Sequence, residues 1–282
     1  PVQILSVTSG EVGNIFTDEY CNVNINVKNL SDNDGTARVY YELDDSRGNP
    51  ASSGTSAIKI EKQSKADIAC NVRLPKYGTY TIKVSAQGDS GVFCTEEYNI
   101  SRVIKNTQTD NTFGVNTHFN QKKGDIEKNL NLIKDAGIGW IRDEISWDRA
   151  EKEKGVISFE GDVWDDYVNA ACEKGIDILM VLGSTNKFYS DGKFPIGEEA
   201  VQAFANYAGE TAKHFAGRVK YYEIFNEAYT NKYYSSQNTG ERYAELVKAA
   251  ASEIRKADPS AKIIANLECF TDDKHHYNYT LA

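Results

Sequence analysis

Apolar and polar residues alternate along most of the first hundred residues. Over Cys21–Val27 every odd position is apolar and every even position is Asn. The same two-residue period recurs over 37–43, 66–74 and 80–84, and clusters rich in Gly, Asn, Asp and Ser separate these runs. Short alternating runs bounded by turns are typical of half-buried strands. The pattern therefore predicts that residues 1–105 form an immunoglobulin-like β-sandwich.

Beyond residue 105 the period lengthens to that of amphipathic helices. Four stretches carry apolar residues three and four positions apart, each with a Gly or Pro soon after it: 126–133, 163–171, 201–215 and 243–254. Such stripes predict a helix body followed by its stop. Five candidate strands lie around them: 112–117, 139–144, 177–183, 219–226 and 262–267. Strands that alternate with helices indicate a parallel sheet.

The spacing of these strands favours one kind of parallel fold. Their starts lie 27 to 43 residues apart, and a (β/α)8 barrel uses about 30 or more residues for each unit. A doubly wound sheet is the alternative, but the segment 116–124 after the first strand lacks a Gly-rich phosphate turn. We expect residues 106–282 to be a (β/α)8 TIM barrel of which about five units are present, which makes the chain a multidomain β plus α/β protein.

Composition narrows the possible partners. The 282 residues include 41 Asp and Glu against 32 Lys and Arg, which gives a net charge of −9. This acidic balance argues against a nucleic-acid partner, which requires a basic face. The longest apolar runs are far shorter than the ~20 residues of a membrane helix, so we expect no membrane partner either. The chain starts at Pro1, without Met or a signal peptide, and it is either a processed product or a piece of a longer one.

The five cysteines do not have the spacing of a metal site, and we expect neither a metal nor another cofactor. Cys21 and Cys70 occupy the apolar phase of alternating runs. They are either ordinary buried thiols or partners in a bridge across the sandwich, and both readings stay open. The state of Cys94 is open as well.

Polar and aromatic residues gather where the strands of the second region end. In a β/α barrel the carboxyl ends of the strands carry the active site. These positions hold His118, Arg142, Glu144, Trp147, Asn186, Lys187, Tyr189, Asn226, Glu227 and Glu268. Carboxylates, amides, an Arg and aromatic rings are suited to binding a sugar and to acid/base chemistry on it.

The most informative stretch is Val219–Ala228, an apolar run that ends in an Asn-Glu pair. Here the chain resembles the clan A glycoside hydrolases, retaining β/α barrels whose general acid/base is the Glu of an Asn-Glu pair at the end of the fourth strand. Phe113–Phe119 resembles their first strand, and Gly139–Glu151 their second strand and its loop. Family 39 and its relatives are the most similar, followed by family 5, over about residues 110–270. Phe225 departs from the Trp that often precedes the pair.

The resemblance assigns roles to individual residues. Glu227 is the general acid/base, which protonates the leaving glycosidic oxygen and later deprotonates water. Asn226 binds the 2-hydroxyl of the sugar, and Arg142 supports the second carboxylate electrostatically. Three further residues line the sugar site: His118, Trp147 and Asn186.

Structural roles compete with some of these assignments. Glu223 shares the inward phase of its strand with Glu227 and lies deeper, which predicts a structural pair, with Arg142 as the candidate partner. A structural role is also an alternative for Arg142. For Trp147 and His118 the alternative is that they are core residues.

The second carboxylate is the missing part of this site. Retaining hydrolysis needs a nucleophile about 5–5.5 Å from the acid, and the resemblance puts it at the seventh strand, beyond residue 282. Glu268 is the one candidate within the sequence. The leading hypothesis is therefore the N-terminal part of a secreted or cell-surface retaining glycoside hydrolase, inactive alone. The alternatives are a non-catalytic carbohydrate-binding or scaffold protein, or one piece of a split barrel completed by a second polypeptide.

Overall fold

The computed structural model describes residues 1–91, 93–228 and 240–265. The chain divides into two compact units, Pro1–Lys105 and Asn106–Ala282. Within the described residues, no helix is both long and apolar enough to cross a membrane.

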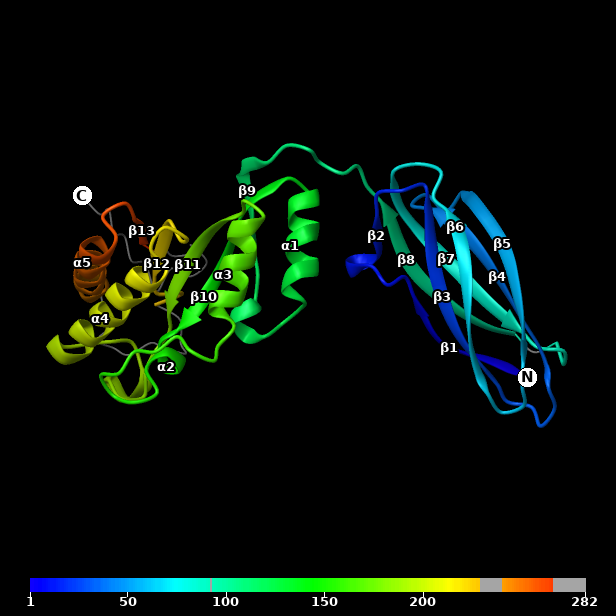
Figure 1. Cartoon of the computed structure of the whole chain (residues 1–282), viewed down its shortest axis with the longest axis horizontal. Coiled ribbons are helices and arrows are strands. Elements are labelled where there is room, and N and C mark those ends of the chain that lie inside the picture. The colour runs from blue at the N-terminus through cyan, green and yellow to red at the C-terminus, as the bar shows by residue number, and fades with distance from the viewer. Residues whose placement is uncertain (92, 229–239, 266–282) are drawn as a thin grey trace. The chain divides into compact units, whose positions relative to one another are not determined.

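The first unit consists of two β-sheets (Figure 1). One sheet has the order β1-β3-β6 and is antiparallel: β1 (Val2–Thr8), β3 (Tyr20–Asn29) and β6 (Lys65–Arg73). The other has the order β2-β8-β7-β4-β5: β2 (Ile15–Phe16), β8 (Phe93–Arg102), β7 (Gly78–Gln87), β4 (Gly35–Asp45) and β5 (Pro50–Ile60). A short helical turn, η1 (Val12–Asn14), precedes β2. Only β2 runs parallel to its neighbour, β8.

The alternating sequence builds the core of this unit. On β3 the apolar residues of the repeat are buried, and the Asn residues between them face the opposite side. Inward residues of both sheets, among them Val23, Ile25, Val39 and Ile82, form one apolar cluster. The period-two pattern thus predicted the strands and their buried face.

The cysteines of the first unit are free thiols. Cys21 lies opposite Val72, and Cys70 lies opposite Val23, so both thiols belong to neighbouring strands of the same sheet. A bridge across the sandwich is therefore wrong, and the reading as buried thiols is confirmed. Cys94 is also free, whereas Cys269 lies outside the described residues.

The second unit is built on a five-stranded parallel sheet. Its strands follow the order of the chain: β9 (Asp110–Asn116), β10 (Ile138–Ser146), β11 (Asp177–Gly183), β12 (Tyr221–Ile224) and β13 (Lys262–Ala265). A doubly wound sheet reverses its strand order at a switch point, and no reversal occurs among these strands. The sequential order is that of consecutive units of a β/α barrel.

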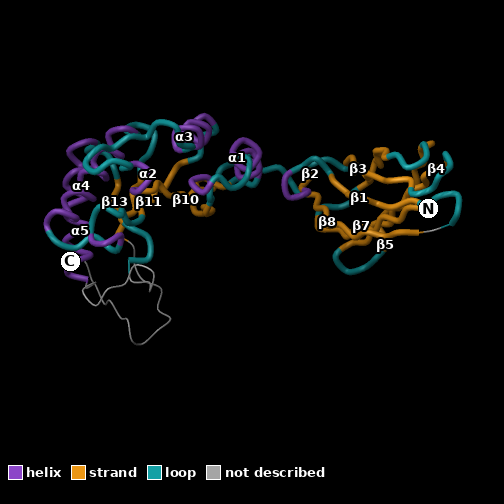
Figure 2. Tube along the Cα trace, turned by 90° about the horizontal axis from the view of Figure 1, so that it is seen from below, coloured by secondary structure: helices purple, strands orange, loops and turns teal. Residues whose placement is uncertain are grey.

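Helices cover the outer side of this sheet (Figure 2). They are α1 (Ile126–Asp135), α2 (Trp147–Ala150), α3 (Trp164–Glu173), α4 (Glu198–His214) and α5 (Gly240–Ala257), with the short turns η2 (Phe119–Gln121) and η3 (Ser190–Gly192). Asp125 begins α1 because its side chain accepts a hydrogen bond from the backbone N–H of Lys128, and Gly137, with φ 76°, follows its end. The four predicted helices all form.

The sheet has one apolar face and one polar face. Along β10, Ile141 and Ile145 are buried in the cluster that includes residues of the helices, whereas Arg142 and Glu144 alternate with them and are half-buried. Because side chains alternate across a strand, Arg142 and Glu144 lie on the inner face of the sheet. This face carries the candidate site.

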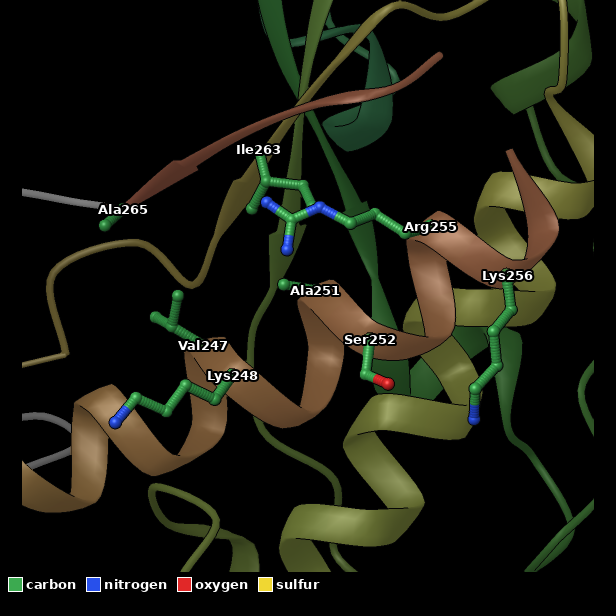
Figure 3. Close-up of a pocket in the computed structure, with 8 residues that line it drawn as sticks. All are labelled: Val247, Lys248, Ala251, Ser252, Arg255, Lys256, Ile263 and Ala265. Carbon is green, nitrogen blue, oxygen red and sulfur yellow. The ribbon is translucent and has the colours of Figure 1, made fainter. Parts of the chain in front are cut away.

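A groove of about 600 Å³ runs between α5 and the edge strand β13 (Figure 3). Four apolar residues, three cations and one serine line it: Val247, Lys248, Ala251, Ser252, Arg255, Lys256, Ile263 and Ala265. At the opposite edge of the sheet, Phe113 of β9 is 64% exposed. Both edges thus present apolar surface.

Candidate active site

Arg142 is the centre of the polar cluster on the inner face. Its Nε donates to Oε2 of Glu223 and its Nη2 to Oε1, both at 2.8 Å. Nη2 also donates to Oδ1 of Asn226 at 2.9 Å. Glu223 lies on β12, with β11 between it and Arg142, so the pair spans two strand spacings. The predicted pairing of Glu223 with Arg142 is confirmed.

The carboxylates around Arg142 favour its charged form. The hydrogen bonds that Arg142 donates to Glu223 raise the pKa of the Arg142 guanidinium, burial opposes this, and the charges of Glu223, Glu144 and Glu227 add to the rise. Neighbouring negative charges favour the protonated form of a guanidinium. Arg142 is therefore a cation held in place by its two hydrogen bonds to Glu223.

The backbone turns sharply where β12 ends. Phe225 has φ 62° and Glu227 has φ 49°, left-handed conformations that residues other than Gly rarely adopt. Phe225 is fully buried, with its ring 5.1 Å from the ring of Phe194, and its N–H donates to the carbonyl of Leu182. This anchor leaves Asn226 half-buried and Glu227 exposed at the carboxyl end of the strand. Strained backbone of this kind clusters at functional sites.

His118 follows β9 at the same end of the sheet and is exposed. Nε2 of Gln121 lies 3.3 Å from its Nδ1. The loop that carries it is held by Asp143, which is 4% exposed and accepts hydrogen bonds from the Thr117 hydroxyl at 2.6 Å and from the N–H of Phe119 at 2.8 Å. Asp143 was not predicted as a site residue, because an acidic residue on the outer phase of a strand carries no signal for a role in a loop.

Trp147 does not reach this site, which corrects its assignment as a sugar-binding residue. It is fully buried, and its ring stacks on Tyr189 at 5.1 Å and on Tyr207 at 5.9 Å. Its indole N–H donates to Oε2 of Glu151 at 2.6 Å. Trp147 opens α2, so the alternation of β10 no longer sets its direction, and it packs into the core.

Asn186 is also placed differently from the expectation. It is 1% exposed. Its Nδ2 donates to the carbonyl of Glu151 at 3.1 Å, and its Oδ1 accepts from the N–H of Phe188 at 3.0 Å. The amide ties two loops together, so in this arrangement Asn186 is a structural residue and not a sugar contact.

Glu144 belongs to the site, although the sequence analysis left it without a role. It precedes the end of β10 on the inner face. A Cβ atom added to Gly183 would lie 2.5 Å from Oε1 of Glu144, so Glu144 reaches over the end of β11. Its strand-end position and its shared phase with Arg142 were the available signals.

Glu268, the nucleophile candidate within the sequence, lies outside the described residues. No group of three or more His, Cys, Asp or Glu residues that could hold a metal ion occurs among residues 1–91, 93–228 and 240–265.

Comparison with known proteins identifies the fold. Neither a protein-family model nor a curated protein matches the sequence. A family 39 glycoside hydrolase from Bacteroides cellulosilyticus WH2 is similar in structure, with a TM-score of 0.67 and 23% identity, over 89% of this chain and 49% of that one. The chain thus has the fold of a glycoside hydrolase, including a partial α/β barrel, and spans about half the length of that structure.

Two other solved structures are similar at a lower level. An endoglucanase from Pseudomonas stutzeri has a TM-score of 0.40 and 18% identity, over 49% of this chain and 41% of that one. A β-glucuronidase from Parabacteroides merdae has a TM-score of 0.37 and 13% identity, over 94% and 33%.

Proposed function

We propose that the chain belongs to a retaining O-glycoside hydrolase that acts on a polysaccharide or oligosaccharide. The observation that carries this proposal is the Asn226–Glu227 pair at the carboxyl end of β12, with Asn226 hydrogen-bonded to Arg142 of β10. Acid/base work on a glycosidic bond needs a carboxylic acid that reaches the leaving oxygen from the rim of the cleft. Glu227 is exposed beside Asn226, which supports this role.

In the proposed mechanism Glu227 protonates the leaving oxygen and then removes a proton from the attacking water. Asn226 binds the 2-hydroxyl of the sugar, and His118 lines the same subsite. Arg142 supports the charge of the second carboxylate, the nucleophile, electrostatically. We expect that nucleophile on a strand beyond residue 282, so a polypeptide of residues 1–282 alone is expected to be inactive.

Among residues 1–91, 93–228 and 240–265, no further strand pairs with β9 or β13 at the two edges of the sheet, which supports completion by further β/α units. The groove beside β13 and the exposed Phe113 of β9 are the surfaces that neighbouring units of a barrel would cover. These units belong either to a longer form of this chain or to a second polypeptide.

For the first unit we propose an immunoglobulin-like topology. Its sheets, β1-β3-β6 and β2-β8-β7-β4-β5, have the neighbour relations of strands A-B-E and C-F-G in that fold. A polymeric substrate does not cross a membrane, and we accordingly propose that the enzyme is secreted or on the cell surface.

The test is hydrolysis by the complete natural protein and its Glu227→Gln variant. On a polysaccharide, whose leaving group needs protonation, we expect the variant to lose about 10²–10⁴-fold in kcat. On an aryl glycoside with a good leaving group, formation of the glycosyl-enzyme should persist, and added azide should speed the second step because azide needs no deprotonation.

The exposed Glu173, changed to Gln, is the matched control. Equal rates for the wild type and Glu227→Gln would refute the assignment, and glycan binding without turnover would identify a carbohydrate-binding protein.

A further inference from the structure

Glu223 is a buried carboxylate that takes no part in the proposed bond cleavage. Its side chain is 7% exposed, against 28% for Arg142. It lies three residues before Asn226, on the inner face of β12, and binds Arg142 through both carboxylate oxygens. A buried, two-point ion pair next to a substrate-binding amide suggests a role beyond packing.

The geometry of the guanidinium group connects Glu223 to Asn226. Arg has five N–H donors in one plane and no acceptor. Glu223 takes the Nε hydrogen and one Nη2 hydrogen, which fixes that plane. The second Nη2 hydrogen is then directed at a single place, and Oδ1 of Asn226 lies there at 2.9 Å.

This contact determines the orientation of the Asn226 amide. An amide side chain can turn either its oxygen or its nitrogen toward a neighbour. Because Arg142 only donates, the oxygen has to face it, and the NH₂ group of Asn226 is directed elsewhere. Asn226 is half-buried and followed by the exposed Glu227, so the open side of the sheet is available to those two donors.

We propose that Glu223 is a positioning residue. It locks the Arg142 guanidinium, and Arg142 in turn holds the Asn226 amide with its N–H donors toward the sugar 2-hydroxyl. The direction of the N–H donors toward a sugar rests on the proposed function. The chain of contacts from Glu223 through Arg142 to Asn226 is independent of it.

The chain contains a matched control for this arrangement. On the outer helices, Nη1 of Arg218 donates to Oδ1 of Asp165 at 2.7 Å and to Oδ1 of Asn169 at 2.8 Å. This trio has the same three kinds of side chain, but it lies on α3 and the segment after α4, away from the inner face. Asp165→Asn therefore disturbs a comparable network without touching the site.

The first measurement does not depend on catalysis. The side-chain NH₂ resonances of Asn226 are recorded by NMR on the complete natural protein labelled with ¹⁵N-Asn and are assigned by their loss in Asn226→Ala. We expect Glu223→Gln, which keeps shape but replaces one acceptor by a donor, to shift these resonances, and Asp165→Asn to leave them in place. Unchanged Asn226 resonances in Glu223→Gln would overturn the proposal. If Glu223→Gln fails to fold, Arg142→Lys, which keeps the cation but removes the planar fork, replaces it with the same expectation.

The second measurement tests the consequence for substrate. The complete natural protein is assayed on an aryl glycoside and on its 2-deoxy counterpart. We expect Glu223→Gln to lower kcat/KM about tenfold or more for the glycoside with the 2-hydroxyl, as expected for a lost hydrogen bond to substrate, and to change it little for the 2-deoxy substrate. Equal losses on both substrates, or no loss on either, would contradict a positioning role. If the wild type hydrolyses neither substrate, the proposed function fails. The NMR result still decides whether Glu223 orients Asn226 through Arg142.

Discussion

At the scale of single residues, the loop that follows β10 is stabilised by one buried carboxylate. Glu151 is 2% exposed, and three donors bind it: the Trp147 indole N–H, the Tyr189 hydroxyl and the Gly155 N–H, each at 2.6 Å. Burial and the bond to Glu151 raise the pKa of Tyr189, which keeps its hydroxyl protonated as a donor. The aromatic residues here hold the loop and do not form a sugar platform.

Trp147→Phe tests this structural role. The substitution keeps most of the stacking on Tyr189 but removes one donor to Glu151. We expect the free energy of unfolding to fall by about 1–3 kcal/mol, the cost of a buried group left without its partner, and glycan affinity to stay unchanged. Urea unfolding and titration calorimetry measure the two quantities. A variant of normal stability that binds glycan more weakly would restore Trp147 to the sugar site.

The thiols allow another test at this scale. Burial raises the pKa of Cys21 to about 11 from 9.0, and the thiolate is the reactive form. The two-unit rise alone makes Cys21 about 100-fold less reactive at neutral pH. Cys172 is exposed, so iodoacetamide should label the Cys172 peptide well before the Cys21 and Cys70 peptides in the native protein. Simultaneous labelling, or a linked Cys21–Cys70 peptide without reductant, would contradict the buried-thiol assignment.

At the scale of helices and strands, hydrophobic period was sufficient to predict the second unit. The stripe at 201–215 became α4 (Glu198–His214), and the run at 177–183 became β11, because an element that buries one face must repeat apolar residues at its own period. Strand phase also predicted that Glu223 lies on the inner face, where it binds Arg142. Trp147 and Asn186 were assigned by resemblance and lie after the strands, where no period fixes the direction of a side chain.

A substitution of Asp165 tests the contacts between α3 and the end of α4. Burial would raise its pKa, but hydrogen bonds from Arg218 and His214 outweigh burial and lower it. A carboxylate whose pKa is lower in the folded protein stabilises the fold at pH values above its unfolded-state pKa, near 3.9. This stabilisation is lost as the pH falls through the folded-state pKa. The melting temperatures of the wild type and Asp165→Asn should therefore differ at pH 6 and converge toward pH 2. Because the side chain is 37% exposed, we expect a difference of less than about 1 kcal/mol. A gap that widens in acid would show that the sign is wrong.

At the scale of the whole molecule, the parallel sheet ends at β9 on one side and at β13 on the other within the part of the chain that the structure describes. Strand order places β9 and β13 at the two ends of the sheet. A barrel removes such edges by closing, and an open sheet presents unpaired backbone groups and apolar surface to other chains. Phe113 and the groove beside Ile263 are the apolar parts of these edges.

A polypeptide that ends at residue 282 is therefore expected to associate in solution. Light scattering after size exclusion should give a mass above the 31.4 kDa of one chain, and the mass should rise with concentration because edge pairing and apolar contact are intermolecular. Phe113→Glu combined with Ile263→Lys should shift the population toward the monomer, since a charge at an edge strand opposes pairing.

The matched control is Tyr20→Glu, at an aromatic residue of the sandwich that is 55% exposed. This substitution should leave the mass unchanged. A wild-type chain that stays monomeric at every concentration would mean that these edges are covered from within the 282 residues, and the proposal that further β/α units close the sheet would lose its physical basis.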